Sequence, residues 1–183
     1  MTSPLRIDAQ RTHGRILQAA ATVLAVDPTA GMDVIAQRAG IGRATLYRHF
    51  ATREDLHAAL RERFVGLLET AAAASRAQAD PREAIRVFVD AGVRAVAESC
   101  PFAEANSDLE VDDRVTVAIE RAIAMFIERA TAQGCLRAGV DTAWVYLVGQ
   151  ALIDAGARQI ALGADVNVVA PRVADTVAAA LVR

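Results

Sequence analysis

Aromatic residues, lysine and cysteine are scarce in this sequence. Phe, Trp and Tyr make up 4% of the 183 residues, and all 20 Lys and Arg positions are arginines. The two cysteines, Cys100 and Cys135, are far apart and lack a Cys-x-x-Cys spacing, which excludes a disulfide framework and indicates no zinc site. Apolar residues still make up 54%. Because Ala, Leu, Val and Ile dominate them, we predict closely packed helices and an all-α fold.

Long uncharged apolar runs are also missing. Charged residues interrupt every apolar segment before the roughly 18 residues that a membrane helix needs, and the N-terminal residues lack the apolar core of a signal peptide. We therefore expect a cytoplasmic protein. The three histidines lack the spacing of metal ligands, and no phosphate-binding glycine loop or nucleophile motif occurs. Neither an enzyme nor a bound metal or cofactor is expected.

The net charge of −2 conceals an asymmetry along the chain. Residues 1–60 contain seven arginines against five acidic residues, whereas the remainder contains thirteen arginines against seventeen acidic residues. All three histidines also lie in residues 1–60. A basic first part joined to an acidic second part indicates that the first part meets a polyanion and the second does not.

The hydrophobic periodicity and the turn signals predict about nine helices. Apolar residues recur at spacings of three and four in the long segments, and glycines, prolines and capping side chains separate them. No internal repeat or separate linker is found. The expected helices span 8–26, 32–38, 43–49, 53–74, 81–99, 112–133, 141–162 and 168–182, with a short irregular or helical piece at 102–110.

Three short helices and their glycine turns predict a helix-turn-helix unit in the first 60 residues. Gly31 is expected to cap the second helix, Gly40 to end it in the left-handed conformation, and Gly42 to start the third. Thr52 then caps the fourth helix. We place a helix-turn-helix domain at residues 1–55 and a larger helical domain at residues 56–183.

The third helix, within the stretch IGRATLYRHF at 41–50, carries the chemistry that suits DNA. Leu46 and Phe50 stand four residues apart and are expected to point into the small core. Arginine can bind guanine with two hydrogen bonds, threonine can contact bases, and tyrosine and histidine can donate to phosphates. The predicted DNA-binding residues are Gly42, Arg43, Ala44, Thr45, Tyr47, Arg48 and His49, with Arg53 and Thr12 as further phosphate contacts.

Residues 31–60, GMDVIAQRAGIGRATLYRHFATREDLHAAL, resemble the DNA-binding head of the TetR family of bacterial transcriptional regulators. The resemblance is carried by the turn glycine, the core positions and the Tyr and His of the third helix. It implies a regulator that binds a palindromic operator, most simply a repressor that a small-molecule effector releases. The positions that match are Ala36, Ala39, Gly40, Thr45, Leu46, Tyr47, His49, Phe50 and Leu56.

The last two helices are the predicted dimer surface, because a helix-turn-helix dimer must present two recognition helices to two half-sites. In the resembled family these helices form a four-helix bundle with those of a second subunit. The alternative is that they close the core of a single chain. The candidate dimer residues combine small side chains with an apolar stripe: Gly149, Ala155, Gly156, Val173, Val177, Ala180 and Leu181.

The resemblance further implies an effector pocket in the larger domain, walled here by helices 81–99, 112–133 and 141–162. Its occupancy would move the fourth helix and change the spacing of the two heads. The mostly apolar walls indicate a mostly apolar small molecule, although the polar residues can equally be exposed or paired within the fold. The candidate ligand-binding residues are Phe88, Arg94, Phe126, Trp144, Tyr146, Gln150 and Asp154.

Two other functions are compatible with the sequence. One is an activator, or a regulator that senses redox state through Cys100 or Cys135. The other is a helical small-molecule-binding protein or enzyme that does not bind DNA. The intact set of Arg43, Thr45, Tyr47 and Arg53 disfavours the second alternative.

Overall fold

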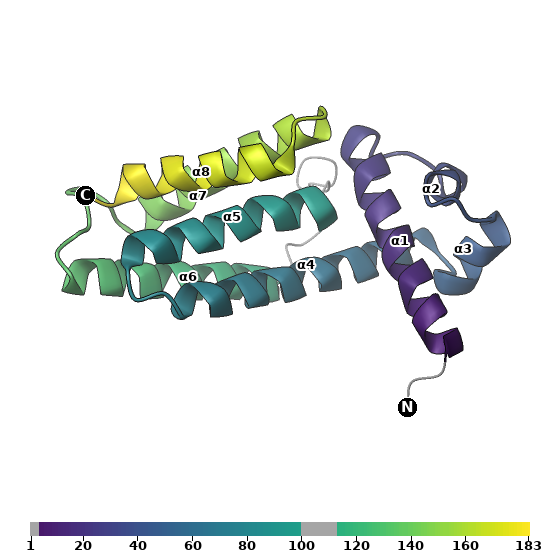
Figure 1. The fold of residues 1–183 in the computed structure, drawn as a ribbon, viewed down its shortest axis with the longest axis horizontal. Coiled ribbons are helices and arrows are strands. Elements are labelled where there is room, and N and C mark those ends of the chain that lie inside the picture. The colour runs from purple at the N-terminus through teal and green to yellow at the C-terminus, as the bar shows by residue number, and fades with distance from the viewer. Residues whose placement is uncertain (1–3, 100–112) are drawn as a thin grey trace. The chain divides into compact units, whose positions relative to one another are not determined.

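The computed structural model describes residues 4–99 and 113–183, which form eight helices (Figure 1). This confirms the predicted all-α class. The expected piece at 102–110 and Cys100 lie outside the described residues. None of the described helices has both the length and the apolar character needed to cross a membrane. The helices are α1 (Pro4–Val26), α2 (Met32–Arg38), α3 (Arg43–His49), α4 (Arg53–Arg76), α5 (Pro81–Ser99), α6 (Asp113–Ala132), α7 (Thr142–Ala161) and α8 (Val166–Leu181).

The described residues divide into two compact units. The first contains residues 4–64 and 97–99, and the second contains residues 65–96 and 113–183. The chain passes from the first unit to the second within α4, and the last three residues of α5 belong to the first unit again. The domain boundary after residue 55 remains a prediction.

Most helix ends follow from local capping signals, as the sequence predicted. Gly40 has φ +65°, and the N–H groups of Gly40 and Ile41 donate to the carbonyls of Gln37 and Ala36 at 3.1 and 3.0 Å. This Schellman arrangement ends α2. Thr52 and Asp55 form a reciprocal capping box at the start of α4, since each backbone N–H donates to the side chain of the other.

The ends of α7 and α8 show one success and one error. Asp141 caps α7 by accepting from the Trp144 N–H at 2.8 Å, as predicted. The start of α8 was predicted at residue 168, but the helix begins at Val166, because Asp165 accepts from the Asn167 N–H at 2.9 Å. Pro171 therefore lies inside α8 and not in its first turn.

The first unit is built around a core that α1, α2, α3 and the start of α4 share. Helix α2 packs on α1 and on α3. Fully buried aliphatic side chains from all four helices meet there, and burying each contributes about 1.5–3 kcal/mol. The largest of them are Ile16, Leu24, Ile35, Leu46, Leu56 and Leu60.

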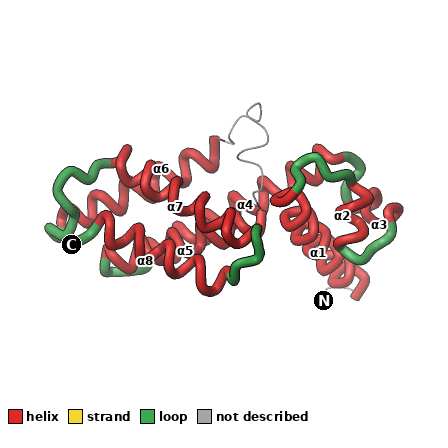
Figure 2. The backbone as a smooth tube through the Cα atoms, turned by 90° about the horizontal axis from the view of Figure 1, so that it is seen from above, coloured by secondary structure: helices red, strands yellow, loops and turns green. Residues whose placement is uncertain are grey.

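The second unit is a bundle in which α7 packs on α8 and on α6 (Figure 2). Its core includes Val89 of α5, Phe126 of α6 and Val177 of α8. Arg86 of α5 binds Asp175 of α8 at 2.6 Å, and its pKa is raised because Asp175 and Glu83 accept hydrogen bonds from it. These contacts hold α5, α6, α7 and α8 together within a single chain.

The structure corrects part of the predicted dimer surface. Gly156, Val177 and Leu181 are buried in the core of the chain itself, and Val173 is half-buried against the same core. Gly149 is half-buried, whereas Ala155 and Ala180 are exposed. The alternative that these helices close the monomer core is therefore correct for the buried residues, which cannot meet a second chain without unfolding the first.

Gly156 is expected to be the least tolerant glycine of α7. A Cβ at this position would lie 2.9 Å from Val173 Cγ2, so the crossing with α8 needs glycine. We expect Gly156→Ala to lower the free energy of unfolding by about 1–2 kcal/mol through overpacking. The matched control is Gly149→Ala, where no atom of another described element lies within 4 Å of the added Cβ. This variant should be stabilised by about 0.5–1 kcal/mol, and urea denaturation of both variants checks the contrast.

Candidate DNA-binding surface and effector pocket

Helix α3 is anchored to the first unit by two buried side chains. Leu46 is 0% exposed and Phe50 is 3% exposed. The Gly42 carbonyl accepts from the N–H groups of Thr45 and Leu46 at 2.9 and 3.1 Å, which starts the helix at Arg43 as predicted. A short helix of seven residues has little stability of its own, so this packing is what holds α3 in place.

The remaining face of α3 points to solvent. Arg43, Ala44, Tyr47 and Arg48 are exposed, whereas Thr45 and His49 are half-buried at the flanks. This exposed face follows from the predicted burial of Leu46 and Phe50. The Arg43 guanidinium lies over the Tyr47 ring, with Cζ 5.5 Å from the ring centroid. The roles of these residues and of Gly42 on DNA remain predictions.

Arg53, predicted as a phosphate contact, holds the loop between α1 and α2. Its guanidinium donates to the carbonyl of Pro28 at 2.6 Å and also to the carbonyl of Ala30. In the same loop, Asp27 accepts from the Thr29 hydroxyl at 2.7 Å and from the Thr29 N–H at 2.9 Å. The Thr29 hydrogen bonds hold the pKa of Asp27 below its usual value, and Arg53 adds to this effect.

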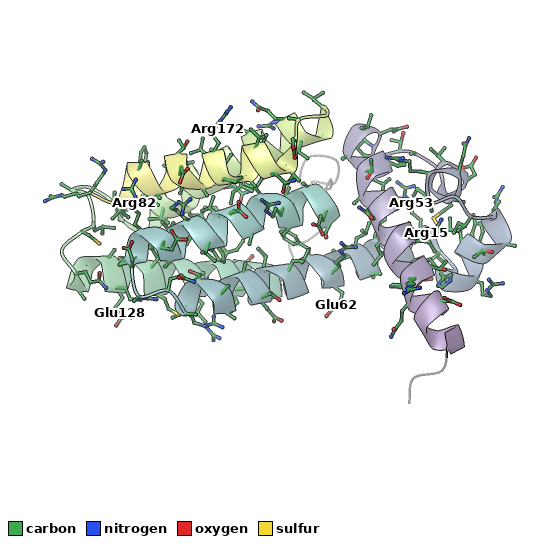
Figure 3. All side chains as sticks on the ribbon, viewed as in Figure 1. Arg15, Arg53, Glu62, Arg82, Glu128 and Arg172 are labelled. Carbon is green, nitrogen blue, oxygen red and sulfur yellow. The ribbon has the colours of Figure 1, made fainter. Side chains whose placement is uncertain are left out.

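Arg15 is a structural residue that the sequence analysis missed. Its guanidinium donates to the Ala39 carbonyl at 2.6 Å and thereby ties α1 to the end of α2, next to the Gly40 turn. Both Arg15 and Arg53 belong to the first unit and are labelled in Figure 3. The only hint in the sequence is that Arg15 directly precedes Ile16 and Leu17, two apolar residues of α1 that are buried.

Two histidines lie beside each other where α1 meets the end of α3. The His13 ring centroid is 6.1 Å from that of His49 and 4.8 Å from that of Phe50. Burial lowers the pKa of His13, and the nearby His49 lowers it further. Thr12, the other predicted phosphate contact, is half-buried on α1.

We expect the first unit to lose stability as the pH falls below about 6.5, the ordinary pKa of histidine. The folded state lowers the pKa of His13, so the unfolded state binds more protons between the two pKa values and stability rises with pH in that window. Burial also lowers the pKa of His57, which acts in the same direction. Urea denaturation across pH should show a weaker dependence in His13→Gln, and an unchanged dependence would contradict this role.

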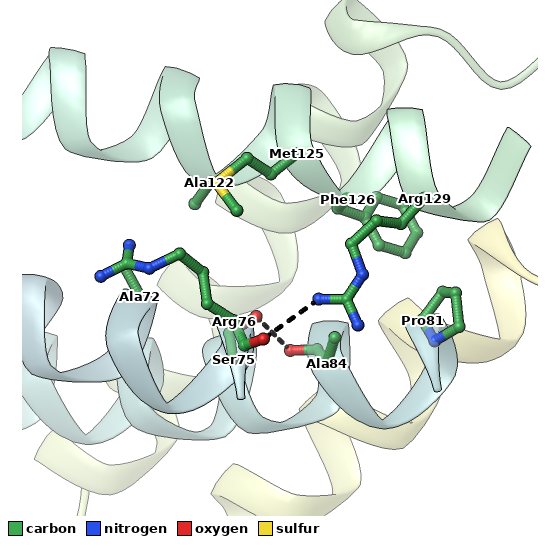
Figure 4. Close-up of a pocket in the computed structure, with 9 residues that line it drawn as sticks. All are labelled: Ala72, Ser75, Arg76, Pro81, Ala84, Ala122, Met125, Phe126 and Arg129. Atoms are coloured by element: carbon green, nitrogen blue, oxygen red, sulfur yellow. Dashed lines mark hydrogen bonds between the residues drawn. The ribbon is translucent and has the colours of Figure 1, made fainter. Parts of the chain in front are cut away.

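A small pocket lies within the second unit between α4, α5 and α6 (Figure 4). It is partly open to solvent, and the space inside it that the centre of a water molecule can occupy is about 20 Å³. Arg129 donates to the Arg76 carbonyl at 3.4 Å, and Ser75 donates to the Ala84 carbonyl at 2.8 Å. The lining is mostly apolar with two guanidinium groups: Ala72, Ser75, Arg76, Pro81, Ala84, Ala122, Met125, Phe126 and Arg129.

Most of the predicted ligand-binding residues lie elsewhere. Phe126 lines the pocket and Phe88 is buried. Trp144 and Tyr146 are each 47% exposed, which contradicts their placement in an interior pocket of the chain. Val145 and Gly156 occupy the inner side of α7, and Trp144 and Tyr146 lie about a quarter turn to either side of Val145.

The polar candidates are engaged with neighbouring side chains. Arg94 donates to Asp90 at 2.8 Å and to Asn167 at 3.0 Å. Gln150 donates to Asp154 at 2.9 Å on the same helix. These bonds favour the structural alternative that the sequence left open for Arg94, Gln150 and Asp154.

Comparisons with known proteins agree with this architecture. Residues 16–60 match the family described as bacterial regulatory proteins, tetR family. A solved TetR transcription regulatory protein from Mycobacterium vanbaalenii is 30% identical, with a TM-score of 0.60 over 87% of this chain and 98% of that one. The repressor LfrR of Mycolicibacterium smegmatis is 44% identical over 102 residues, 54% of this chain and 50% of LfrR.

Two further comparisons concern a bound ligand and chain length. The crystal structure of LfrR in complex with proflavine matches with 26% identity and a TM-score of 0.62, covering 91% of this chain and 95% of that one. An uncharacterized HTH-type transcriptional regulator of Mycobacterium tuberculosis is 34% identical over 152 residues. That match covers 78% of this chain and 58% of the relative, so the chain spans little more than half the length of this curated relative.

Proposed function

The chain belongs to the TetR family of bacterial regulatory proteins, and we propose that it is a sequence-specific DNA-binding transcriptional regulator. In this proposal a homodimer binds a palindromic operator as a repressor, and a small, mostly apolar effector releases it. The observation that carries the proposal is the exposed face of α3. Arg43, Tyr47 and Arg48 project from a helix that Leu46 and Phe50 hold to the core.

Exposed donors on α3 suit the major groove of DNA. Arginine reads guanine through two hydrogen bonds, and the exposed Ala44 leaves room for the helix to approach the bases. The half-buried Thr45 and His49 lie at the edges of the same face. In this proposal Thr45 contacts a base, and His49 contacts a phosphate that fixes the orientation of the helix. Thr12 and the start of α4 at Arg53 supply further phosphate contacts in this proposal.

The dimer is proposed to form through the outer side of α7. We define the α7 stripe as Trp144, Leu147, Ala151 and Ala155, which recur at spacings of three and four and are all exposed. Leu162, directly after α7, is also exposed. Continuous apolar surface of this kind on a folded chain marks an interaction site. The α7 stripe replaces the buried Gly156, Val177 and Leu181 as the proposed contact.

The pocket between α4, α5 and α6 is the proposed effector site, and an effector has to widen it, because it now holds little more than a water-sized molecule. Its apolar floor, with Met125 and Phe126, suits a mostly apolar molecule, and the guanidinium groups of Arg76 and Arg129 favour a neutral or anionic effector over a cation. An effector there would contact Ala72 and Ser75 of α4. It releases the operator only if it binds the DNA-incompetent state more tightly than the DNA-bound state.

Selection from a random pool of double-stranded DNA tests the proposal. We expect enrichment of a palindrome whose half-sites are separated by about one helical turn, roughly 34 Å, or a multiple of it. Small, mostly apolar compounds are then screened for release of the selected DNA. Proflavine, which LfrR binds, is included as a cationic compound that the two arginines should disfavour. Failure to enrich any sequence, with or without compounds, would rule out the proposed function.

A further inference from the structure

The guanidinium of Arg43 makes a different contact from those of Arg15 and Arg53, two other arginines of the first unit. Arg15 donates to the Ala39 carbonyl at 2.6 Å, and Arg53 donates to the carbonyls of Pro28, at 2.6 Å, and Ala30, so these N–H groups are occupied. Among the described residues none accepts a hydrogen bond from Arg43, which instead lies over the Tyr47 ring at 5.5 Å. The guanidinium carbon lies over the face of the Tyr47 ring.

Helix geometry explains why Tyr47 reaches Arg43. Residues four apart share one face of a helix, and long side chains lean toward the N-terminus, so the Tyr47 ring extends over the turn that carries Arg43. A separation under about 6 Å gives a cation–π attraction between the guanidinium and the ring. This attraction uses none of the lone pairs that a hydrogen bond needs, and the guanidinium has five N–H donors, so Arg43 can still donate two hydrogen bonds to a guanine.

We infer that Tyr47 is a positioning residue that holds the Arg43 guanidinium ready to read a guanine in each operator half-site. This inference rests on the proposed function. The stacked pair restricts the rotamers of Arg43 before DNA binds, so less side-chain entropy is lost in forming two hydrogen bonds to guanine. The ring and the hydroxyl of Tyr47 then have separate tasks, since the hydroxyl remains available for a phosphate.

Two substitutions of Tyr47 separate these tasks in the full chain. Tyr47→Phe keeps the ring and should weaken binding to all DNA by about tenfold, as loss of one hydrogen bond to a charged group does. The ratio of affinities for the selected operator and for an operator with the guanine replaced should stay unchanged. Tyr47→Leu should lower this ratio in addition by about two- to fivefold, the worth of an exposed cation–π contact.

A double-mutant cycle assigns the extra loss to Arg43. The extra loss of selectivity in Tyr47→Leu should vanish in an Arg43→Ala background and persist in an Arg48→Ala background, where an exposed arginine of the same helix is removed instead. Circular dichroism checks that each variant folds. Equal selectivity in Tyr47→Phe and Tyr47→Leu, or a loss that persists without Arg43, would overturn the inference while leaving the proposed function intact.

Nuclear magnetic resonance of the DNA-free protein gives a second readout. The Arg43 side-chain protons should show an upfield ring-current shift that Tyr47→Phe retains and Tyr47→Leu removes. Absence of that shift in the wild-type chain overturns the stacked pair, whatever the binding data show. If the random pool yields no sequence at all, the proposed function fails and the inference fails with it.

Discussion

Arg53→Ala is expected to lower the free energy of unfolding by about 3 kcal/mol, because two charge-assisted hydrogen bonds are lost. The Arg53 guanidinium donates to the carbonyls of Pro28 and Ala30, and Ala30 is buried. Removing the side chain leaves these acceptors without their donor and frees the loop between α1 and α2. Urea denaturation of the full chain and hydrogen exchange in the loop check the prediction.

Arg53→Lys separates loop stabilisation from phosphate binding. A lysine keeps the positive charge but lacks the two-pronged guanidinium, so it can contact a phosphate without bridging two carbonyls. We expect Arg53→Lys to remain destabilised by about 1.5 kcal/mol or more. Arg48→Ala, at an exposed position on α3, serves as the control and should stay within about 0.5 kcal/mol of wild type. If Arg53→Ala is as stable as the wild type but binds all DNA more weakly, Arg53 contacts phosphate and does not stabilise the loop.

Local features of the first unit could be predicted from the sequence because their causes lie within a few residues. Gly40 ends α2 through its own left-handed conformation, and Thr52 caps α4 through the residue three positions later. The spacing of Leu46 and Phe50 likewise set the inner face of α3, and both are buried. The exposed face followed from the same spacing.

Contacts between distant residues could not be predicted in this way. Arg53 lies 25 residues from Pro28, and Arg15 lies 24 residues from Ala39. An arginine that binds carbonyls and an arginine that binds phosphate have the same local sequence pattern. Only the packing of α1, α2 and the start of α4 distinguishes the two kinds of arginine. From the sequence, Arg53 was therefore predicted to contact a phosphate, and no role was predicted for Arg15.

The side of α7 that packs inward could not be predicted either, for a different reason. Apolar residues occur around the whole helix, so periodicity does not show which side packs inward. Gly156 was expected at the dimer surface, yet it lies against Val173 in the core. Trp144 was expected inside a pocket, yet it is exposed. Only the packing of α7 on α6 and α8 identifies the outer side.

Leu147→Asp is expected to dissociate the proposed dimer. Leu147 lies in the α7 stripe and is 58% exposed in the single chain. A dimer would bury one unpaired carboxylate from each subunit, and this desolvation should raise the dimer dissociation constant by about a hundredfold or more. Sedimentation measures the change directly. Emission from Trp144, the single tryptophan of the chain, should shift to the red if dimerisation shields it in the wild type.

Val117→Asp is the matched control, because Val117 is an aliphatic residue of α6 that is 52% exposed and lies outside the α7 stripe. This variant should remain dimeric. On DNA, Leu147→Asp should lose about a hundredfold in affinity for the two-half-site operator yet bind an isolated half-site as the wild type does, since α3 is untouched. Equal dissociation of both variants, or a dimer that tolerates Leu147→Asp, would place the interface elsewhere and leave the exposed apolar residues of α7 to another partner.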